Sequence, residues 1–136
     1  MKKEYSYGAV VYRYMNQQLF VLLEHMAKGH TSIPKGHIEE GETPLECAHR
    51  EIKEETNLDC VIDDSFSYTI TYSPLPNVIK DVTFFLATPK TETLLPQLCE
   101  VLSLEWVKED RALEMLTHDS DKEVMKNALL AIKSKL

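Results

Sequence analysis

The segment from Thr43 to Thr56 constrains the fold more than any other, because its residues agree on one amphipathic helix. Its first residues, Thr43–Glu46, provide an N-cap, a proline at the first helical position and a glutamate three residues after the cap. We therefore predict a helix from Pro44 to about Thr56. Its apolar side chains recur at helical spacing along one stripe: Leu45, Ala48 and Ile52.

The same helix carries three glutamates on a face that lies away from most of the apolar stripe. Glu51, Glu54 and Glu55 are three and four residues apart, so their carboxylates should converge. Their repulsion costs about a few tenths of a kcal/mol per pair, near a helix end whose dipole disfavours anions. A hard divalent cation such as Mg²⁺, which prefers oxygen ligands, would offset that repulsion. Arg50 is placed to brace a neighbouring carboxylate as a bidentate donor.

A solvated acidic face is the alternative interpretation, and for a glutamate-rich helix in general it is the more common one. The preceding loop favours a binding site instead. Residues 28–43 hold three of the four glycines together with Lys35 and His37, directly before the acidic helix.

The remaining segments predict strands first and helices last. Two further helices are expected, one over Glu109–Leu116 and one from Ser120, capped together with Glu123, to about Lys133. This order predicts an α/β fold with a mixed, partly antiparallel sheet between helices, in a single domain over residues 1–136. The predicted strands are Tyr5–Tyr14, Gln18–Glu24, Cys60–Ile62, Phe66–Tyr72, Ile79–Ala87 and Leu104–Val107, with a turn at Met15–Gln17.

Composition excludes several classes of function. The net charge of −7 argues against an extended nucleic acid as partner, which would require many lysines and arginines against phosphates. A small phosphate ligand stays open, because a bound cation reverses the local sign of charge. The three cysteines form no Cys-x-x-Cys pair, and no apolar run approaches the roughly 20 residues of a membrane helix. We therefore expect a cytoplasmic protein with reduced thiols and no membrane partner.

The stretch from Gly36 to Leu58 resembles the signature of the Nudix hydrolases. That pattern is a glycine, five residues, a glutamate, seven residues, Arg-Glu, an aliphatic residue, any residue, Glu-Glu, any residue, a glycine and an aliphatic residue. Eight of the nine specified positions match here; the departure is Asn57 for glycine, a good substitute at a left-handed helix end. The resemblance covers nearly the whole chain and implies the Nudix α/β/α sandwich. The matching residues are Gly36, Glu42, Arg50, Glu51, Ile52, Glu54, Glu55 and Leu58.

The resemblance implies a metal-dependent hydrolase, because Nudix enzymes cleave a nucleoside diphosphate linked to another group. Glu51, Glu54 and Glu55 would hold Mg²⁺ or Mn²⁺, with the Gly36 carbonyl as a further ligand. Glu54 is the preferred general base, and Glu100 is another candidate for that role. The cation would neutralise charge on the pyrophosphate and activate water.

Arg50 is a candidate catalytic residue because its guanidinium could brace one of these carboxylates. Together with Glu42, it would shape the loop and the helix rather than touch substrate.

The loop Pro34-Lys35-Gly36-His37 resembles the diadenosine tetraphosphate hydrolase branch of the family. Lys35 would then donate to a phosphate, and His37 would be a second donor or a neighbour of the metal. The alternative is a solvated lysine and a histidine that belongs to the turn.

The strand near Lys80 has a second resemblance to that branch, which often carries a lysine followed by an aromatic pair. Lys80 would reach a distal phosphate, and Phe84 would stack on adenine without donating a hydrogen bond. Tyr72 is a further stacking candidate. Because neighbouring residues alternate across a strand, at least one of Phe84 and Phe85 should be core.

The leading hypothesis is asymmetric hydrolysis of a bis(5′-nucleosyl) tetraphosphate to a nucleoside triphosphate and a monophosphate. The same chemistry on a nucleoside triphosphate, a nucleotide sugar or a 5′-triphosphate RNA end is the first alternative. A non-catalytic nucleotide sensor on the same scaffold is the second. In each case the expected partner is a small nucleotide or a nucleotide end.

Overall fold

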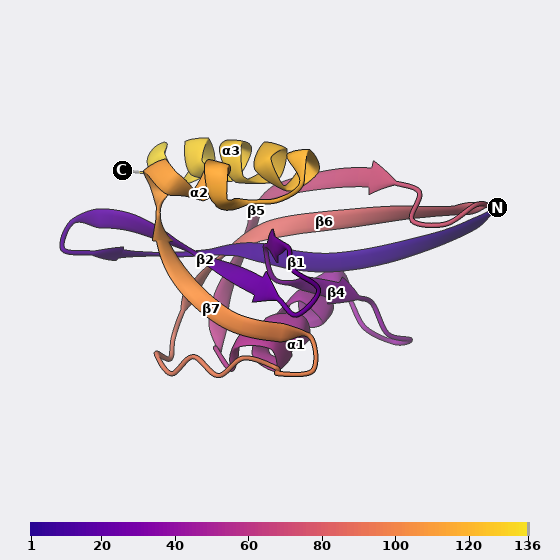
Figure 1. The fold of residues 1–136 in the computed structure, drawn as a ribbon, viewed down its shortest axis with the longest axis horizontal. Helices are drawn as coiled ribbons and strands as arrows, with labels where there is room; N and C mark the ends of the chain where they lie inside the picture. Colours follow the sequence, from indigo (N-terminus) through magenta and orange to yellow (C-terminus); the bar gives the residue numbers. More distant parts are fainter. Residues whose placement is uncertain (136) are drawn as a thin grey trace.

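The computed structural model describes residues 1–135, and its elements follow the predicted order closely (Figure 1). These residues form seven strands and three helices, with α1 between β4 and β5 and the other two helices at the end. Helix α1 has the predicted bounds, and the strands are mostly longer than expected. The elements are β1 (Lys2–Met15), β2 (Gln18–Met26), β3 (Thr31–Ser32), β4 (Lys35–His37), α1 (Pro44–Thr56), β5 (Cys60–Tyr72), β6 (Val78–Pro89), β7 (Val101–Lys108), α2 (Glu109–Met115) and α3 (Asp119–Lys133).

The sheet is mixed, as predicted. Strands β1 and β6 run parallel, with Lys2 opposite Val78 and Val11 opposite Ala87, whereas the other strand pairs are antiparallel. The order through the sheet is β3-β2-β1-β6-β5, with β4 paired to β1 and β7 paired to β2. The β1–β2 hairpin turns where predicted, at Asn16 and Gln17, which both have positive φ.

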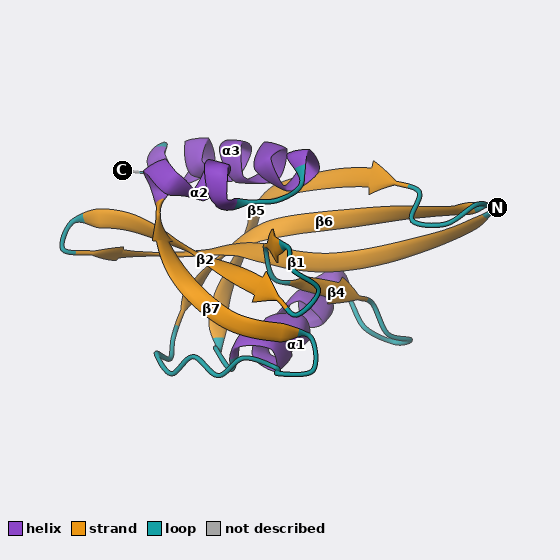
Figure 2. Cartoon of the chain, viewed as in Figure 1, coloured by secondary structure: helices purple, strands orange, loops and turns teal. Residues whose placement is uncertain are grey.

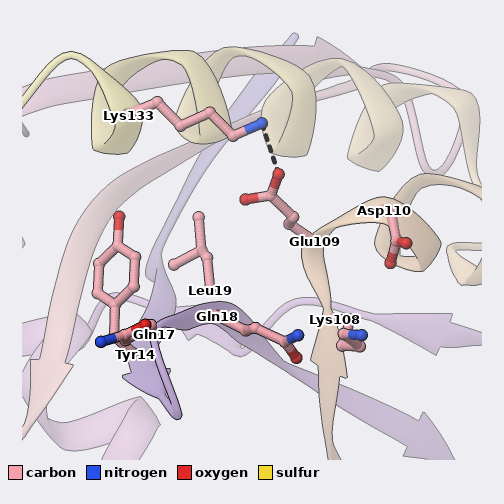
Figure 3. A pocket seen from close by; sticks show the side chains of 8 residues that line it. All are labelled: Tyr14, Gln17, Gln18, Leu19, Lys108, Glu109, Asp110 and Lys133. Atoms are coloured by element: carbon pink, nitrogen blue, oxygen red, sulfur yellow. Dashed lines mark ion pairs between the residues drawn. The ribbon is translucent and has the colours of Figure 1, made fainter.

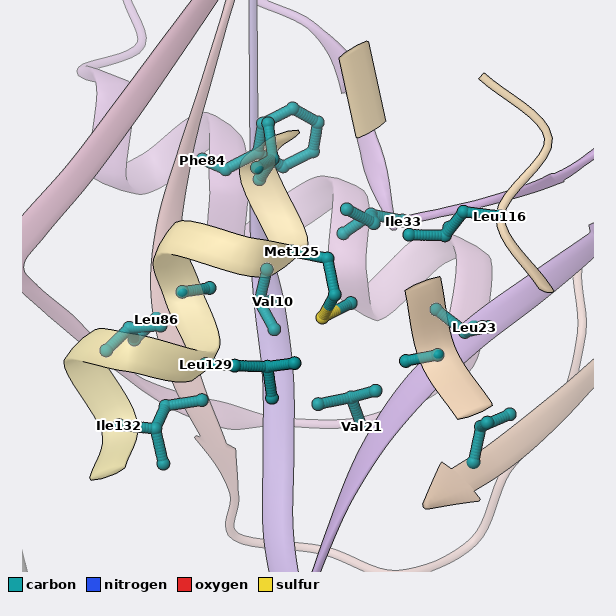
Figure 4. Close-up of a cluster of buried hydrophobic side chains, with 14 of the residues drawn as sticks. Val10, Val21, Leu23, Ile33, Phe84, Leu86, Leu116, Met125, Leu129 and Ile132 are labelled. Atoms are coloured by element: carbon teal, nitrogen blue, oxygen red, sulfur yellow. The ribbon is translucent and has the colours of Figure 1, made fainter. Parts of the chain in front are cut away.

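Helices cover both faces of the sheet, which confirms the predicted α/β/α arrangement (Figure 2). Successive strand residues enter different cores: Val10 faces the core under α2 and α3, whereas Ala9 and Val11 face the core over α1. The first core contains the predicted stripe of the last helix, drawn in part in Figure 4: Val124, Ala128, Leu129 and Ile132.

Local hydrogen bonds fix both ends of α1. Thr43 and Glu46 form the predicted capping box, because the Glu46 N–H donates to Thr43 Oγ1 and the Thr43 N–H donates to Glu46 Oε1. At the other end Asn57 is left-handed, with φ of 71°, and its N–H donates to the Lys53 carbonyl. The residue that departs from the family pattern therefore still ends the helix as glycine would.

Some details of the predicted elements are wrong, and the short strands β3 and β4 lie in the segment that was expected to be a loop. The predicted strands Cys60–Ile62 and Phe66–Tyr72 are one strand, whose pairing with β6 is irregular between Asp63 and Tyr68. The backbone stays extended through this irregularity because a bulge interrupts the pairing without ending the strand.

The expected capping box at Ser120 is absent from the described chain. Helix α3 begins one residue earlier, at Asp119, and His118 takes the N-cap position without a side-chain cap. Ser120 is consequently already helical, so its hydroxyl cannot act as the cap.

No helix within residues 1–135 combines the length and apolar character needed to cross a membrane.

The three cysteines differ in accessibility, which gives a direct test of the packing. Cys47 and Cys60 are buried and Cys99 is exposed. Burial raises the thiol pKa of Cys47 and of Cys60 to about 11, so both stay protonated and unreactive near pH 8. A thiol-reactive chromogenic disulfide should therefore label one cysteine rapidly in the native protein and three in denaturant. Rapid labelling of more than one native thiol would contradict this packing.

Candidate active site

Arg50 connects the loop before α1 to the carboxylates of that helix. Its Nε and Nη2 donate to the two oxygens of Glu42 at 2.7 and 2.9 Å, in the bidentate geometry expected from the sequence. Its Nη1 donates to Glu51 Oε1 at 2.7 Å, and Nη2 also donates to the His37 carbonyl at 3.0 Å. The hydrogen bonds from Arg50 hold the pKa of the Glu42 carboxyl below its usual range. This network fixes the shape of the loop against the helix.

Gly36 and Gly8 lie where neighbouring atoms leave no room for a side chain. A Cβ added to Gly36 would lie 1.9 Å from Glu51 Oε2, and one added to Gly8 would lie 2.0 Å from the Pro34 carbonyl. The Gly36 carbonyl itself accepts from Cys47 Sγ at 3.5 Å. Strand β4 is thereby pressed onto the Glu51 side chain, and Lys35 onto β1.

Glu55 lies in a buried acidic pair that the sequence did not predict. Its side chain is 3% exposed, and it neighbours Glu24 of β2, which is 1% exposed. Burial, followed by the nearby carboxyl groups of Glu24 and Glu51, raises the pKa of Glu55 strongly. Glu24 follows an almost continuous apolar run, and a charged residue in such a strand is the signal that would have identified it.

The three glutamates of α1 share a helix flank but have different surroundings. Glu51 is held by Arg50, Glu55 turns toward Glu24, and the half-exposed Glu54 lies 3.3 Å from Arg50 Nη1. Among the described residues, no three His, Cys, Asp or Glu side chains already converge into a metal-binding group. The predicted convergence of the three carboxylates is therefore not seen, because Glu55 turns to Glu24 and Glu51 to Arg50, and the flank presents separate carboxylates rather than a closed cage.

Two cavities share Lys35 and His30 as wall residues. One, of about 460 Å³, has a mainly cationic polar lining, and the other, of about 300 Å³, includes aromatic and apolar side chains. The first is lined by Met26, Ala27, Lys28, His30, Lys35, Lys80, Cys99 and Glu100. The second is lined by His30, Ser32, Lys35, Ile70, Tyr72, His118, Ser120 and Asp121.

These cavities bring together four of the residues that the sequence singled out for substrate or catalysis. Lys35 lines both cavities, Lys80 and Glu100 line the cationic one, and Tyr72 lines the other. Burial, and then the charge of Lys35, lowers the pKa of Lys80. Segments that lie far apart in the sequence thus meet around one lysine.

His30 and Asp121 are site residues that sequence reasoning missed. Asp121 is 5% exposed, and burial raises its pKa although Lys35, His118 and His30 oppose that shift. The rings of His30 and His118 lie 5.5 Å apart, and burial followed by the charge of His118 lowers the pKa of His30. The tertiary fold alone brings these two residues next to Lys35, since neither belongs to a recognisable motif.

The expectation that Phe84 stacks on a base is wrong. Its ring is fully buried in the core under α2 and α3 (Figure 4), because even-numbered residues of β6 point to that face. Phe85 points to the opposite face, stacks with Tyr7 and is also nearly buried. His37 is exposed and its ring faces the Ile38 carbonyl, so the structure does not bring it into either cavity.

A separate cavity of about 540 Å³ lies by the β1–β2 hairpin and the end of α3 (Figure 3). Lys133 and Glu109 form an ion pair of 2.6 Å across it. Of the described residues that line this cavity, none belongs to the predicted site. We therefore place the candidate active site around Lys35 and the carboxylate helix.

Comparison with known proteins identifies the family to which the chain belongs. A family model described as NUDIX domain matches residues 3–128. The 8-oxo-(d)GTP phosphatase of Mycolicibacterium smegmatis is 34% identical over 95 residues, which is 70% of this chain and 29% of that protein. Nudix hydrolase 10 of Arabidopsis thaliana is 30% identical over 117 residues, which is 84% of this chain and 41% of that protein. The chain thus spans less than half the length of these two relatives.

A solved structure shares the fold over almost its full length. The Ap4A hydrolase of C. elegans, crystallised as a binary complex, superposes with a TM-score of 0.82 at 24% identity, covering 94% of this chain and 98% of that one. At this identity the likeness concerns the fold. The family model covers most of the chain, and the signature residues run from Gly36 on β4 through α1 to Leu58. The chain therefore belongs to the Nudix hydrolase family.

Proposed function

We propose that the protein hydrolyses dinucleoside tetraphosphates asymmetrically, adding water to diadenosine tetraphosphate to release ATP and AMP. The observation that carries this proposal is the position of Lys35, which lines both cavities and lies on β4, the strand pressed against Glu51. A polyphosphate chain that passes Lys35 would have a cationic cavity on one side and a partly aromatic one on the other.

The two cavities suit different parts of such a substrate. Lys28, Lys35 and Lys80 supply positive charge for phosphates on the cationic side. On the other side, Tyr72 and Ile70 offer a surface on which a nucleobase can stack, while Ser120 and Asp121 offer polar atoms to its edge. The C. elegans neighbour, described as an Ap4A hydrolase, supports the same substrate class through its fold.

The residues on α1 fit a divalent cation. Two buried carboxyl groups, Glu55 and Glu24, lie side by side with Glu51 nearby, and the raised pKa of Glu55 reflects the cost of ionising it without a cation. Glu51, Glu54 and Glu55 would hold Mg²⁺ or Mn²⁺, with the Gly36 carbonyl as a further candidate ligand. When bound, the cation supplies charge neutralisation at the pyrophosphate and lowers the pKa of water.

The chain's own groups orient the reaction. Glu54 is half-exposed and free enough to accept a proton from water, and Arg50 holds Glu51 and Glu42 in place. Glu100 lines the cationic cavity and is the alternative base. Lys35 and Lys80 would bind and orient phosphate oxygens.

The product pattern tests the proposal. With Mg²⁺ and diadenosine tetraphosphate, we expect equal amounts of ATP and AMP, separated by anion-exchange chromatography. Reaction in H₂¹⁸O followed by mass spectrometry will identify the phosphorus that water attacks. Two ADP molecules would contradict asymmetric cleavage, and binding without turnover would instead indicate a nucleotide sensor.

A nucleoside triphosphate with an oxidised guanine base is the second candidate substrate. The 34% identity to the 8-oxo-(d)GTP phosphatase favours it. Comparing kcat/KM for diadenosine tetraphosphate, 8-oxo-dGTP, ADP-ribose and a triphosphorylated RNA oligomer will rank the candidates.

A further inference from the structure

Glu24 occupies a position in β2 where an apolar residue is expected. Leu19, Val21 and Leu23 point into the core under α2 and α3, and Leu22 points into the core over α1. By the two-residue period of a strand, Glu24 points to the α1 side together with Leu22. It is paired in register with Ser32 and Leu104, so it lies inside the sheet rather than at a frayed end.

One oxygen of the buried Glu24 carboxyl also lacks a hydrogen-bond partner. Its side chain is 1% exposed, and its Oε1 has no hydrogen-bond partner among residues 1–135. Such buried acceptors are rare, because an unmade hydrogen bond in the interior costs the desolvation of that oxygen. An unpartnered carboxylate oxygen inside a protein therefore requires an explanation.

The groups around Glu24 are mostly acidic. Glu55 and Glu51 face it from α1, and Glu100 approaches from the segment before β7. The only cation among the charged groups that act on Glu24 is Lys35 of β4, and no ion pair joins the two within the described residues. A proton shared between the Glu24 and Glu55 carboxyl groups is the arrangement that competes with a bound cation.

We propose that Glu24 is a ligand of the divalent cation, supplied by β2 to complete the carboxylate site of α1, and that it would hold the cation together with Glu55 and Glu51. This inference rests on the proposed metal-dependent function and adds a residue from outside the signature segment. The ligand class is a hard divalent cation such as Mg²⁺ or Mn²⁺, because all the groups involved offer carboxylate oxygens.

Binding of Mn²⁺ by itself tests this role without recourse to activity. Glu24→Gln keeps the size of the side chain and donates a hydrogen bond to Glu55, so a purely structural acid would be replaced with little change. As a cation ligand, its loss should weaken Mn²⁺ binding on the order of 10-fold or more. Free Mn²⁺ measured by electron paramagnetic resonance during a titration gives the affinity directly.

Thermal unfolding provides a second, independent readout. Mg²⁺ should raise the Tm of the unmodified protein, and this rise should be reduced or lost in Glu24→Gln. Glu24→Leu, which matches the apolar neighbours on β2, should fold in metal-free buffer and show the same loss of Mn²⁺ affinity. Glu114→Gln removes the charge of an exposed glutamate on α2 and serves as the matched control, with unchanged binding.

The outcomes separate this inference from the proposed function. If the unmodified protein binds Mn²⁺ and both Glu24 variants bind it equally well, Glu24 is a structural acid and the inference is overturned. If the unmodified protein binds no Mn²⁺ and Mg²⁺ leaves its Tm unchanged, the metal-dependent function fails as a whole, and this inference fails with it.

Discussion

Replacing Glu54 with glutamine should slow hydrolysis of the nucleotide substrate on the order of 10²-fold or more, because the variant loses a proton acceptor and candidate cation ligand. The side chain is half-exposed and touches Arg50 at 3.3 Å, so the change should leave the core and the stability intact. Steady-state kinetics at saturating Mg²⁺ will show whether kcat falls while the Tm is preserved.

The interpretation of Glu54→Gln depends on two controls. EDTA in excess over metal should abolish turnover by the unmodified protein, and added Mg²⁺ should restore it. Glu114→Gln, an exposed change away from the site, should retain full activity. Full activity in EDTA would reject the metal mechanism, and near-normal kcat for Glu54→Gln would transfer the role of base to Glu100.

Truncation of Phe84 to alanine should lower the free energy of unfolding by about 3–5 kcal/mol, the usual cost of removing a fully buried ring. The ring lies in the core with Val10, Ile33 and Met125 around it (Figure 4), and no part of it reaches a cavity surface. Urea unfolding followed by circular dichroism gives the change directly.

A milder substitution at the same position separates packing from substrate stacking. Phe84→Leu should cost less stability, since part of the volume is retained, and should leave the KM for nucleotide unchanged. A large rise in KM without loss of stability would indicate that the ring stacks on the base after all. Tyr72→Leu is the matched comparison, because Tyr72 lines the cavity and should raise KM with little effect on stability.

The network around Arg50 shows how the signature combines structure with chemistry. Glu42 receives two hydrogen bonds from Arg50 and anchors the loop, whereas Glu51 receives one and faces Gly36. Because Gly36 has no side chain, the loop backbone and the Glu51 carboxyl share one small space. The residues that match the family signature therefore include some that only hold the loop against the helix, such as Glu42, and others that can bind a cation, such as Glu51.

Sequence alone determined the features that depend on neighbours within a turn or two. Short-range geometry determines the capping box at Thr43, the left-handed end at Asn57 and the helix between them. It also places Glu51, Glu54 and Glu55 on one flank of that helix. The mixed sheet followed from the order of elements along the chain.

Only the tertiary structure decided which side chains meet across elements. Alternation along β6 separates Phe84 from Phe85, but the packing of α2 and α3 decides that Phe84 is core. Likewise, the pairing of Glu24 with Glu55 and the meeting of Asp121 with Lys35 join residues about 30 and 90 positions apart, beyond any periodicity of a helix or strand. Strand register and helix docking set these contacts, because they alone fix distances between segments that share no local hydrogen bonds.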